Sequence, residues 1–160
     1  MKKQFLLIVI VLLSFEFSPK NSKLKVDNNQ IVIPINKELK ISVEINNGNL
    51  NNFKLISKSK VKKPIDMMKA FDNIEKEEIV SNEIEIKFCH ADFMGSKMVV
   101  LKTVHHLEKP IIFKAKIKIK GRPDYIETSI VNKYPNVVSI EQWNDEIESI
   151  ILFDFTILEE

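Results

Sequence analysis

The stretch Ile111–Lys120 reads IIFKAKIKIK, with apolar and basic side chains alternating along it. One face of this stretch holds Phe113, Ala115, Ile117 and Ile119, and the other face holds four lysines. Side chains repeat every two residues on one face of a β-strand, so the stretch predicts a half-buried strand. Lysines along one face commonly keep a strand from pairing edge to edge with another chain, and we expect that role here.

The same period of two recurs along most of the chain. We expect further strands at residues 30–35, 39–45, 53–57, 83–89, 98–107, 126–131, 136–141 and 147–158. The last of these is apolar on both faces around residues 150–153, which is typical of a central strand. Pro34 has no backbone donor and suits an edge strand. Asn46–Asn49 and Gly121–Asp124 have the composition of turns between strands.

One segment departs from this period. Between Pro64 and Ile79 apolar residues recur every three to four positions, which predicts a single short amphipathic helix with Pro64 in its first turn. About eight short strands, regular turns and one helix favour an all-β fold, an antiparallel β-sandwich of the immunoglobulin-like kind. A small closed β-barrel is the alternative, because sequence periodicity does not separate the two.

The first twenty residues have the layout of a secretory signal peptide. Lys2 and Lys3 precede nine apolar residues, 5–13, and Glu16 and Pro19 follow. This apolar run is too short for a membrane-spanning helix, which needs about 20 residues. We therefore expect residues 1–20 to direct export and residues 21–160 to form one domain in the bacterial periplasm or outside the cell. Cleavage of the segment and its retention as an anchor are both open.

Charge and composition exclude several classes of function. The 160 residues carry 24 basic and 22 acidic side chains, and residues 1–20 hold three lysines and one glutamate. The remaining chain therefore has 21 of each, which gives no overall attraction to nucleic acid. Neither glycine-rich phosphate-binding motif occurs among the three glycines. The single cysteine, Cys89, cannot form an internal disulfide.

The reactive side chains do not form a catalytic or metal-binding pattern. Cys89 and His90 are consecutive, so on a strand they point to opposite faces and cannot activate each other. His105 would lie about seven residue pairs away along the expected hairpin, roughly 23 Å. A smaller metal site, with Cys89 or His90 and Asp92 or Met94, is the alternative. We expect no enzyme activity, no metal and no cofactor.

Three aromatic residues lie in expected loops. They are Tyr125, Tyr134 and Trp143, which lie close to Pro123, Pro135 and Asn144 in the sequence. Exposed aromatic side chains anchor partner proteins or sugars, because they are large and lose little conformational entropy on binding. The alternative is that these residues cover the end of the sandwich core.

A basic cluster precedes the expected helix. It consists of Lys58, Lys60, Lys62 and Lys63. The cluster is a candidate surface for an anionic partner, and the alternative is a solvated loop. No arginines or aromatic residues are interleaved with these lysines, which argues against specific recognition of nucleic acid.

These features together favour a binding protein. The leading hypothesis is an exported, non-enzymatic β-sandwich that binds a macromolecular partner at the cell envelope, either a protein or a glycan. Loops on a rigid sandwich are the usual place for such a function. One alternative is a periplasmic inhibitor or immunity-type protein that blocks an enzyme, and another is a carrier of a small apolar ligand. The sequence leaves the oligomeric state open.

Overall fold

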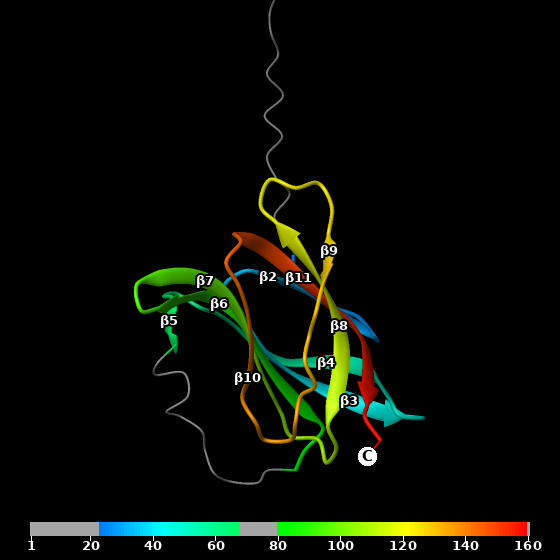
Figure 1. The fold of residues 1–160 in the computed structure, drawn as a ribbon. Helices are drawn as coiled ribbons and strands as arrows, with labels where there is room; N and C mark the ends of the chain where they lie inside the picture. The colour runs from blue at the N-terminus through cyan, green and yellow to red at the C-terminus, as the bar shows by residue number, and fades with distance from the viewer. Residues whose placement is uncertain (1–22, 68–79, 160) are drawn as a thin grey trace, which may run out of the picture.

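A computed structural model describes residues 23–67 and 80–159, which form an all-β fold (Figure 1). The described residues form eleven strands, namely β1 (Lys25–Val26), β2 (Gln30–Pro34), β3 (Lys37–Asn46), β4 (Asn49–Lys60), β5 (Ile65–Asp66), β6 (Glu83–Phe93), β7 (Ser96–His105), β8 (Ile111–Ile119), β9 (Ile126–Thr128), β10 (Ser139–Trp143) and β11 (Ile147–Ile157). Each of the longer predicted strands is present. The two-residue strands β1 and β5 were not predicted, because two residues are too few to show a period.

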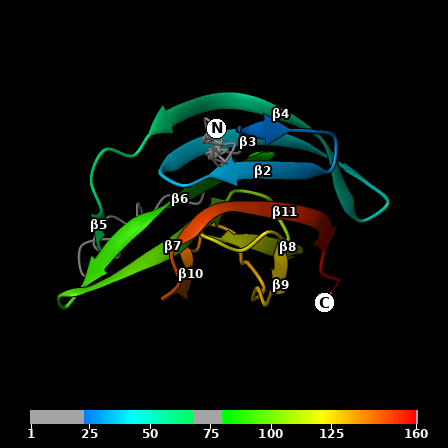
Figure 2. The same ribbon diagram turned by 90° about the horizontal axis from the view of Figure 1, so that it is seen from above.

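Backbone hydrogen bonds join the strands into one open sheet, which folds over into two layers (Figures 1 and 2). One layer has the order β1-β2-β11-β8-β9, and the other has the order β4-β3-β6-β7-β10. The layers join at a corner where Thr156 of β11 pairs with Asn49 of β4. Apart from the parallel pair β5–β6, neighbouring strands are antiparallel. The structure thus confirms a sandwich-like antiparallel fold, and the closed-barrel alternative is wrong.

Alternating apolar residues from both layers fill the space between them. The main core includes Ile31, Ile33, Phe113, Ile150 and Leu152 from one layer and Leu39, Ile41, Ile86, Phe88 and Leu101 from the other. Phe155 packs against Phe53 at 4.9 Å and against Phe113 at 4.7 Å, measured between ring centroids. Full burial of each such side chain contributes about 1.5–3 kcal/mol relative to exposure.

Strand β11 is central, as predicted. It pairs with β2 on one side and with β8 on the other, and its residues Ile150 and Leu152 are fully buried. The proline at the end of β2 is compatible with this arrangement. Strand β1 pairs only with Ile31 and Val32, so Pro34 lies beyond it and its missing donor interrupts no ladder on that side.

The lysines of β8 have a different role from the one predicted. Strand β8 pairs with β11 on one side and with β9 over residues 115–117 on the other, so this part of β8 is not an edge. Two of its outward lysines contact carboxylates of neighbouring strands, with Nζ–O distances of 3.0 Å for Lys114–Asp154 and 3.6 Å for Lys116–Glu127. Lys118 Nζ donates to the Pro123 carbonyl, and Lys120, directly after β8, lies 2.8 Å from Glu146.

The expected helix is wrong at its start. Ile65 and Asp66 form β5, which pairs with Ala91 and Asp92 of β6 where β3 no longer covers that strand. Ile65 also packs on a second, smaller core that includes Met67 and Cys89. At Ile65 and Asp66, an unpaired strand edge and an apolar surface therefore outweigh the local helical period, whereas Met67 is helical. Residues 68–79 of the expected helix lie outside the described residues, as does the expected signal peptide at residues 1–20.

The segment between β9 and β10 also differs from expectation. Both strands are shorter or shifted relative to the predicted 126–131 and 136–141, and residues 129–138 cross from one layer to the other. Lys133 in this crossing segment pairs with Ile111 of β8. Contacts with both layers therefore replace strand pairing over these residues. In the described ranges, the structure contains no helix long and apolar enough to span a membrane.

Candidate functional site

The three candidate aromatic residues have different surroundings. Trp143, at the end of β10, is half-buried against the main core, and its ring makes an edge contact with Phe88 at 6.5 Å between centroids. Its Nε1 donates a hydrogen bond of 2.9 Å to Thr128 Oγ1. Trp143 therefore joins the short strands β9 and β10 across the two layers. Binding of a partner by Trp143 stays a prediction.

Tyr125 is also half-buried. Its hydroxyl lies 2.7 Å from Ser149 Oγ, and Lys118 Nζ lies 5.9 Å from its ring centroid. These contacts hold the turn after β8 against β11. Tyr125 offers only part of its ring to a partner, and its predicted role in binding likewise stays a prediction.

Tyr134 is the exposed member of the three, and it has exposed apolar neighbours. Its side chain is 55% exposed, and those of Val131 and Val137 are 61% and 51% exposed. We call these three residues the Tyr134 patch. All of them lie on the segment that crosses between the layers. Sequence reasoning placed Val131 and Val137 in strands and missed them. Their spacing of three residues around Tyr134 was the available signal.

A buried lysine supports this patch from below. Lys133 is 1% exposed, and its ammonium forms an ion pair with Glu141 of β10 and lies 5.6 Å from the ring centroid of Phe113. Glu141 Oε1 also accepts a hydrogen bond of 3.1 Å from the backbone amide of Val131. The Lys133 side chain points inward, whereas the side chains of the Tyr134 patch point outward. Burial lowers the pKa of Lys133, and its hydrogen bond with Glu141 opposes that shift.

The backbone of Lys133 joins the two layers. Its carbonyl accepts hydrogen bonds from the Ile111 amide at 2.9 Å and from His105 Nε2 at 3.0 Å. Its amide donates to the Ile111 carbonyl at 2.8 Å. His105 is fully buried, and burial is the main cause that lowers its pKa. The neutral ring is therefore favoured, with the proton on Nε2.

A second pair of contacts holds the other end of the patch. The Asn136 amide donates to the His105 carbonyl at 2.8 Å, and Asn136 Oδ1 lies 2.6 Å from His106 Nδ1. Asn136 has a φ of +57°, a conformation that asparagine tolerates better than most residues. The Tyr134 patch is thus an exposed apolar surface on a backbone fixed at several points.

The basic cluster is divided by the fold. Lys58 and Lys60 lie on β4, whereas Lys62 and Lys63 lie in the segment between β4 and β5, and all four are exposed. Of these four lysines, Lys58 lines a cleft of about 690 Å³ at one end of the sandwich. The other cleft residues are Lys23, Leu24, Pro34, Ile35, Lys37, His90, Lys120, Glu146, Ile147 and Glu148. Sequence reasoning missed this grouping because the residues come from six separate segments.

Cys89 is a core residue. It is fully buried in the second core, and burial raises the pKa of its thiol to about 11, so the thiol is protonated and unreactive at neutral pH. His90 lies on the opposite face and lines the cleft, as consecutive strand residues should. His90 pairs with Val99 and Ile84 with His105, which confirms the expected hairpin. Within the described residues, no group of three or more His, Cys, Asp or Glu side chains is placed to hold a metal ion.

Comparison with known proteins gave no match to a family model, to a curated protein or to a solved structure.

Proposed function

We propose that this chain is an exported, non-enzymatic binding protein of the cell envelope, and that it holds a partner protein through the Tyr134 patch. The observation that carries the proposal is that exposed apolar side chains lie on a loop whose backbone is held in place. Tyr134, Val131 and Val137 are all more than half exposed. The loop that carries them is anchored by a lysine that is 1% exposed. Export rests on the signal-like layout of residues 1–20.

Fixation matters because a flexible loop loses entropy when it binds. A loop already ordered by the Lys133–Glu141 pair and by the contacts of Asn136 avoids much of that cost. Tyrosine is enriched among the residues that dominate binding energy at interfaces, and surrounding apolar residues exclude water from such an anchor. A protein surface with an apolar pocket for Tyr134 would match this patch.

The proposal is tested by capture from the native envelope fraction with tagged full-length protein, followed by affinity measurement with the captured partner. We expect Tyr134→Ala/Val137→Ala to weaken binding at least about tenfold, the effect of losing one strong interface anchor. The matched control is Ile56→Ala/Met94→Ala, which removes two exposed apolar side chains elsewhere on the molecule.

Thermal unfolding of both variants checks that neither substitution disturbs the fold. Binding that persists in Tyr134→Ala/Val137→Ala, or that falls equally in the control, contradicts the proposal. Capture that is lost after removal of glycans would assign the patch to a sugar instead.

The inhibitor or immunity-type alternative would use a charged surface such as the basic cluster around Lys58 and Lys63, and the identity of the partner separates it from the main proposal. An enzyme that loses activity on addition of one equivalent of this protein would assign that role. A carrier that holds a small apolar ligand in an internal cavity is less compatible with the observed interior, because Phe88, Phe113 and the aliphatic side chains of both layers fill the space between them.

A further inference from the structure

A diagonal row of basic side chains crosses three adjacent strands at the end of the sandwich that holds the cleft. Lys37 of β3 pairs with Phe88 of β6, and Leu39 pairs with Lys58 of β4. Lys58 and His90 are therefore the diagonal neighbours of Lys37 on the two adjoining strands. Diagonal neighbours on one face lie about 7–8 Å apart, within reach of lysine side chains that converge on one ligand.

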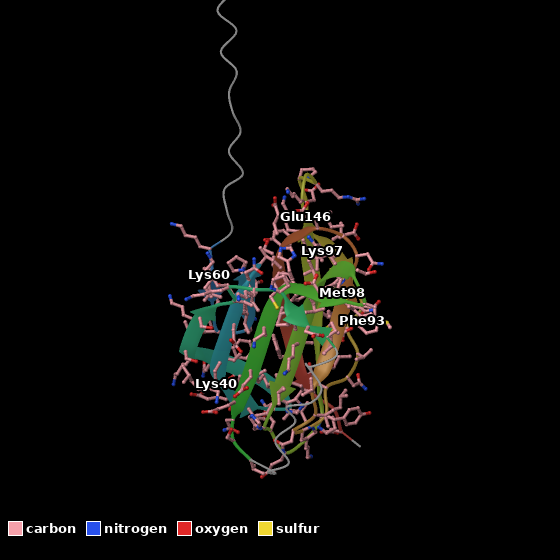
Figure 3. The ribbon with its side chains drawn as sticks, turned by 90° about the vertical axis from the view of Figure 1, so that its left-hand side faces the viewer. Lys40, Lys60, Phe93, Lys97, Met98 and Glu146 are labelled. Carbon is pink, nitrogen blue, oxygen red and sulfur yellow. The ribbon has the colours of Figure 1, made fainter. Side chains whose placement is uncertain are left out.

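This row faces the space between the layers. Phe88 and Leu39 are core residues, and strand side chains two residues apart share a face. Lys37, Lys58 and His90 therefore continue the inner face beyond the core, where the layers open into the cleft of about 690 Å³. Figure 3 shows the same end of the molecule, with Lys60 of β4 and Glu146 beside β11 both towards the top.

Asn36 fixes the geometry of this end. Its φ of +62° makes the tight connection from β2 to β3, and its carbonyl accepts a hydrogen bond of 3.1 Å from the Val61 amide. Its side-chain Oδ1 accepts one of 3.4 Å from the amide of His90. One turn residue thus holds the end of β4 and His90 of β6 beside Lys37.

The two lysines of this row, and Lys23 on the same cleft, have no compensating charge in the part of the chain that the structure describes. Lys23, Lys37 and Lys58 make no ion pair or hydrogen bond through their ammonium groups within the described residues. Lys37 is nevertheless half-buried. The outer face of the same layer is different, because Lys40 lies 2.8 Å from Glu85 and Lys87 lies 2.7 Å from Glu38. The lysines without an ion pair therefore lie where the cleft opens, whereas the lysines on the outer face of the layer are in ion pairs.

The opposite wall of the cleft limits where an anion can lie. Glu146 forms an ion pair with Lys120 at 2.8 Å, whereas Glu148 forms no ion pair among the residues described and has only a weaker electrostatic interaction with Lys120. An anion is therefore repelled from Glu148 and attracted towards Lys37 and Lys58. Leu24, Pro34, Ile35 and Ile147 add apolar surface to the same walls.

We propose that this cleft is a binding site for an organic phosphate monoester, with its phosphate on Lys37, Lys58 and Lys23 and its organic part against the apolar wall. Lysine binds phosphate well as a point charge, and three lysines are enough to neutralise the charge of nearly −2 that a phosphate monoester carries at neutral pH. A cleft of about 690 Å³ lies within the usual range for small-molecule sites. This site is independent of the Tyr134 patch.

Glycerol 3-phosphate is a suitable probe, and its binding to the full-length protein is measured by calorimetry. We expect Lys37→Gln/Lys58→Gln to weaken binding at least about tenfold, because charge-assisted contacts are lost. The matched control is Lys62→Gln/Lys63→Gln, which removes the same charge from exposed lysines of the same sequence cluster that do not line the cleft. This control should bind as the unmodified protein does.

A variant that is expected to strengthen binding keeps the test independent of folding. Glu148→Gln removes a repulsive carboxylate from the cleft and should tighten glycerol 3-phosphate binding about threefold. A loss of stability cannot produce such a gain. Binding that is unchanged or weakened in this variant would overturn the proposed placement of the phosphate.

Comparison of probes shows whether the cleft recognises the organic part of the ligand and whether the ligand is a lipid or a soluble molecule. Stronger binding of glycerol 3-phosphate than of inorganic phosphate supports the organic phosphate site, and equal binding of the two overturns it. Binding to phosphatidylcholine vesicles only when they contain phosphatidic acid assigns the site to a lipid headgroup, and binding of the soluble ester alone assigns it to a free metabolite. Absence of binding to every probe, or equal loss in both lysine double variants, would overturn the proposal.

Discussion

Single residues hold the two layers together at the end that carries the Tyr134 patch. Lys133 is the clearest case, because a buried ammonium is unfavourable unless it is paired. Glu141 and the face of Phe113 compensate it, and its backbone carbonyl receives hydrogen bonds from both layers. His105 completes this arrangement at a fully buried position, where its Nδ1 has no hydrogen-bond partner among the described residues.

The buried His105 should make stability depend on pH. Its pKa in the folded protein is lowered below the ordinary 6.5 by burial, whereas the unfolded chain keeps the ordinary value. Below pH 6.5 the unfolded chain therefore binds more protons at this residue than the folded protein does. The contribution of His105 is fully present above about pH 6.5 and is lost as pH falls towards its folded pKa.

Urea unfolding between pH 7.5 and pH 5 measures this effect. We expect the free energy of unfolding to fall across that range and His105→Gln to reduce the slope. The same slope in His105→Gln and the unmodified protein would show that another group is responsible.

At the scale of elements, the hairpins use the same turn with different residues. Asn47 and Gly48 join β3 to β4 with φ of +51° and +74°, and Met94 and Gly95 join β6 to β7 with φ of +47° and +83°. Two positive φ values are typical of the turn that matches the twist of a two-residue hairpin, and asparagine followed by glycine is its preferred sequence. Met94 is therefore an unfavourable residue in this turn, and it is 85% exposed.

Replacement of Met94 should stabilise the β6–β7 hairpin. We expect Met94→Asn to raise the free energy of unfolding by about 1 kcal/mol, because asparagine tolerates the left-handed conformation that costs other residues about that amount. The reverse substitution in the other hairpin, Asn47→Met, should lower it by a similar amount. Chemical denaturation of both variants provides the measurement, and a destabilising Met94→Asn would mean that Met94 makes a stabilising contact.

At the scale of the whole molecule, the two candidate surfaces lie at opposite ends of the sandwich. Strand β8 connects the ends, since its first residue, Ile111, pairs with Lys133 and its last residue, Ile119, precedes Lys120 of the cleft. A strand of nine residues spans about 30 Å. A partner protein on the Tyr134 patch would therefore leave the cleft accessible.

The proposed export also belongs to this scale, because export would determine which partners the protein meets. We expect the full-length protein with a C-terminal tag to be found in the envelope or periplasmic fraction of a bacterial host. Ile8→Lys/Ile10→Lys interrupts the apolar run and should retain the protein in the cytoplasm, whereas Gln4→Lys lies before that run and should be exported. N-terminal sequencing identifies a cleavage site, and cytoplasmic accumulation of the unmodified protein would contradict export.

The sequence alone determined the features that depend on near neighbours along the chain. Alternation of apolar and polar residues predicted the longer strands, since a strand with one buried face repeats every two residues. The runs that include Ile41, Phe88 and Phe113 were predicted in this way, and so was the turn at Asn47 and Gly48. The apolar character of residues 150–153 on both faces predicted the central place of β11.

Only the tertiary structure decided which distant residues meet. The pairing of β3 with both β4 and β6 brings Lys37, Lys58 and His90 together, although they lie more than fifty residues apart from first to last. Ile65 and Asp66 joined an open strand edge despite a helical period, and Lys133 became buried because Glu141 and Phe113 were placed around it. Such outcomes depend on pairing and burial between separate segments, which a local pattern does not encode.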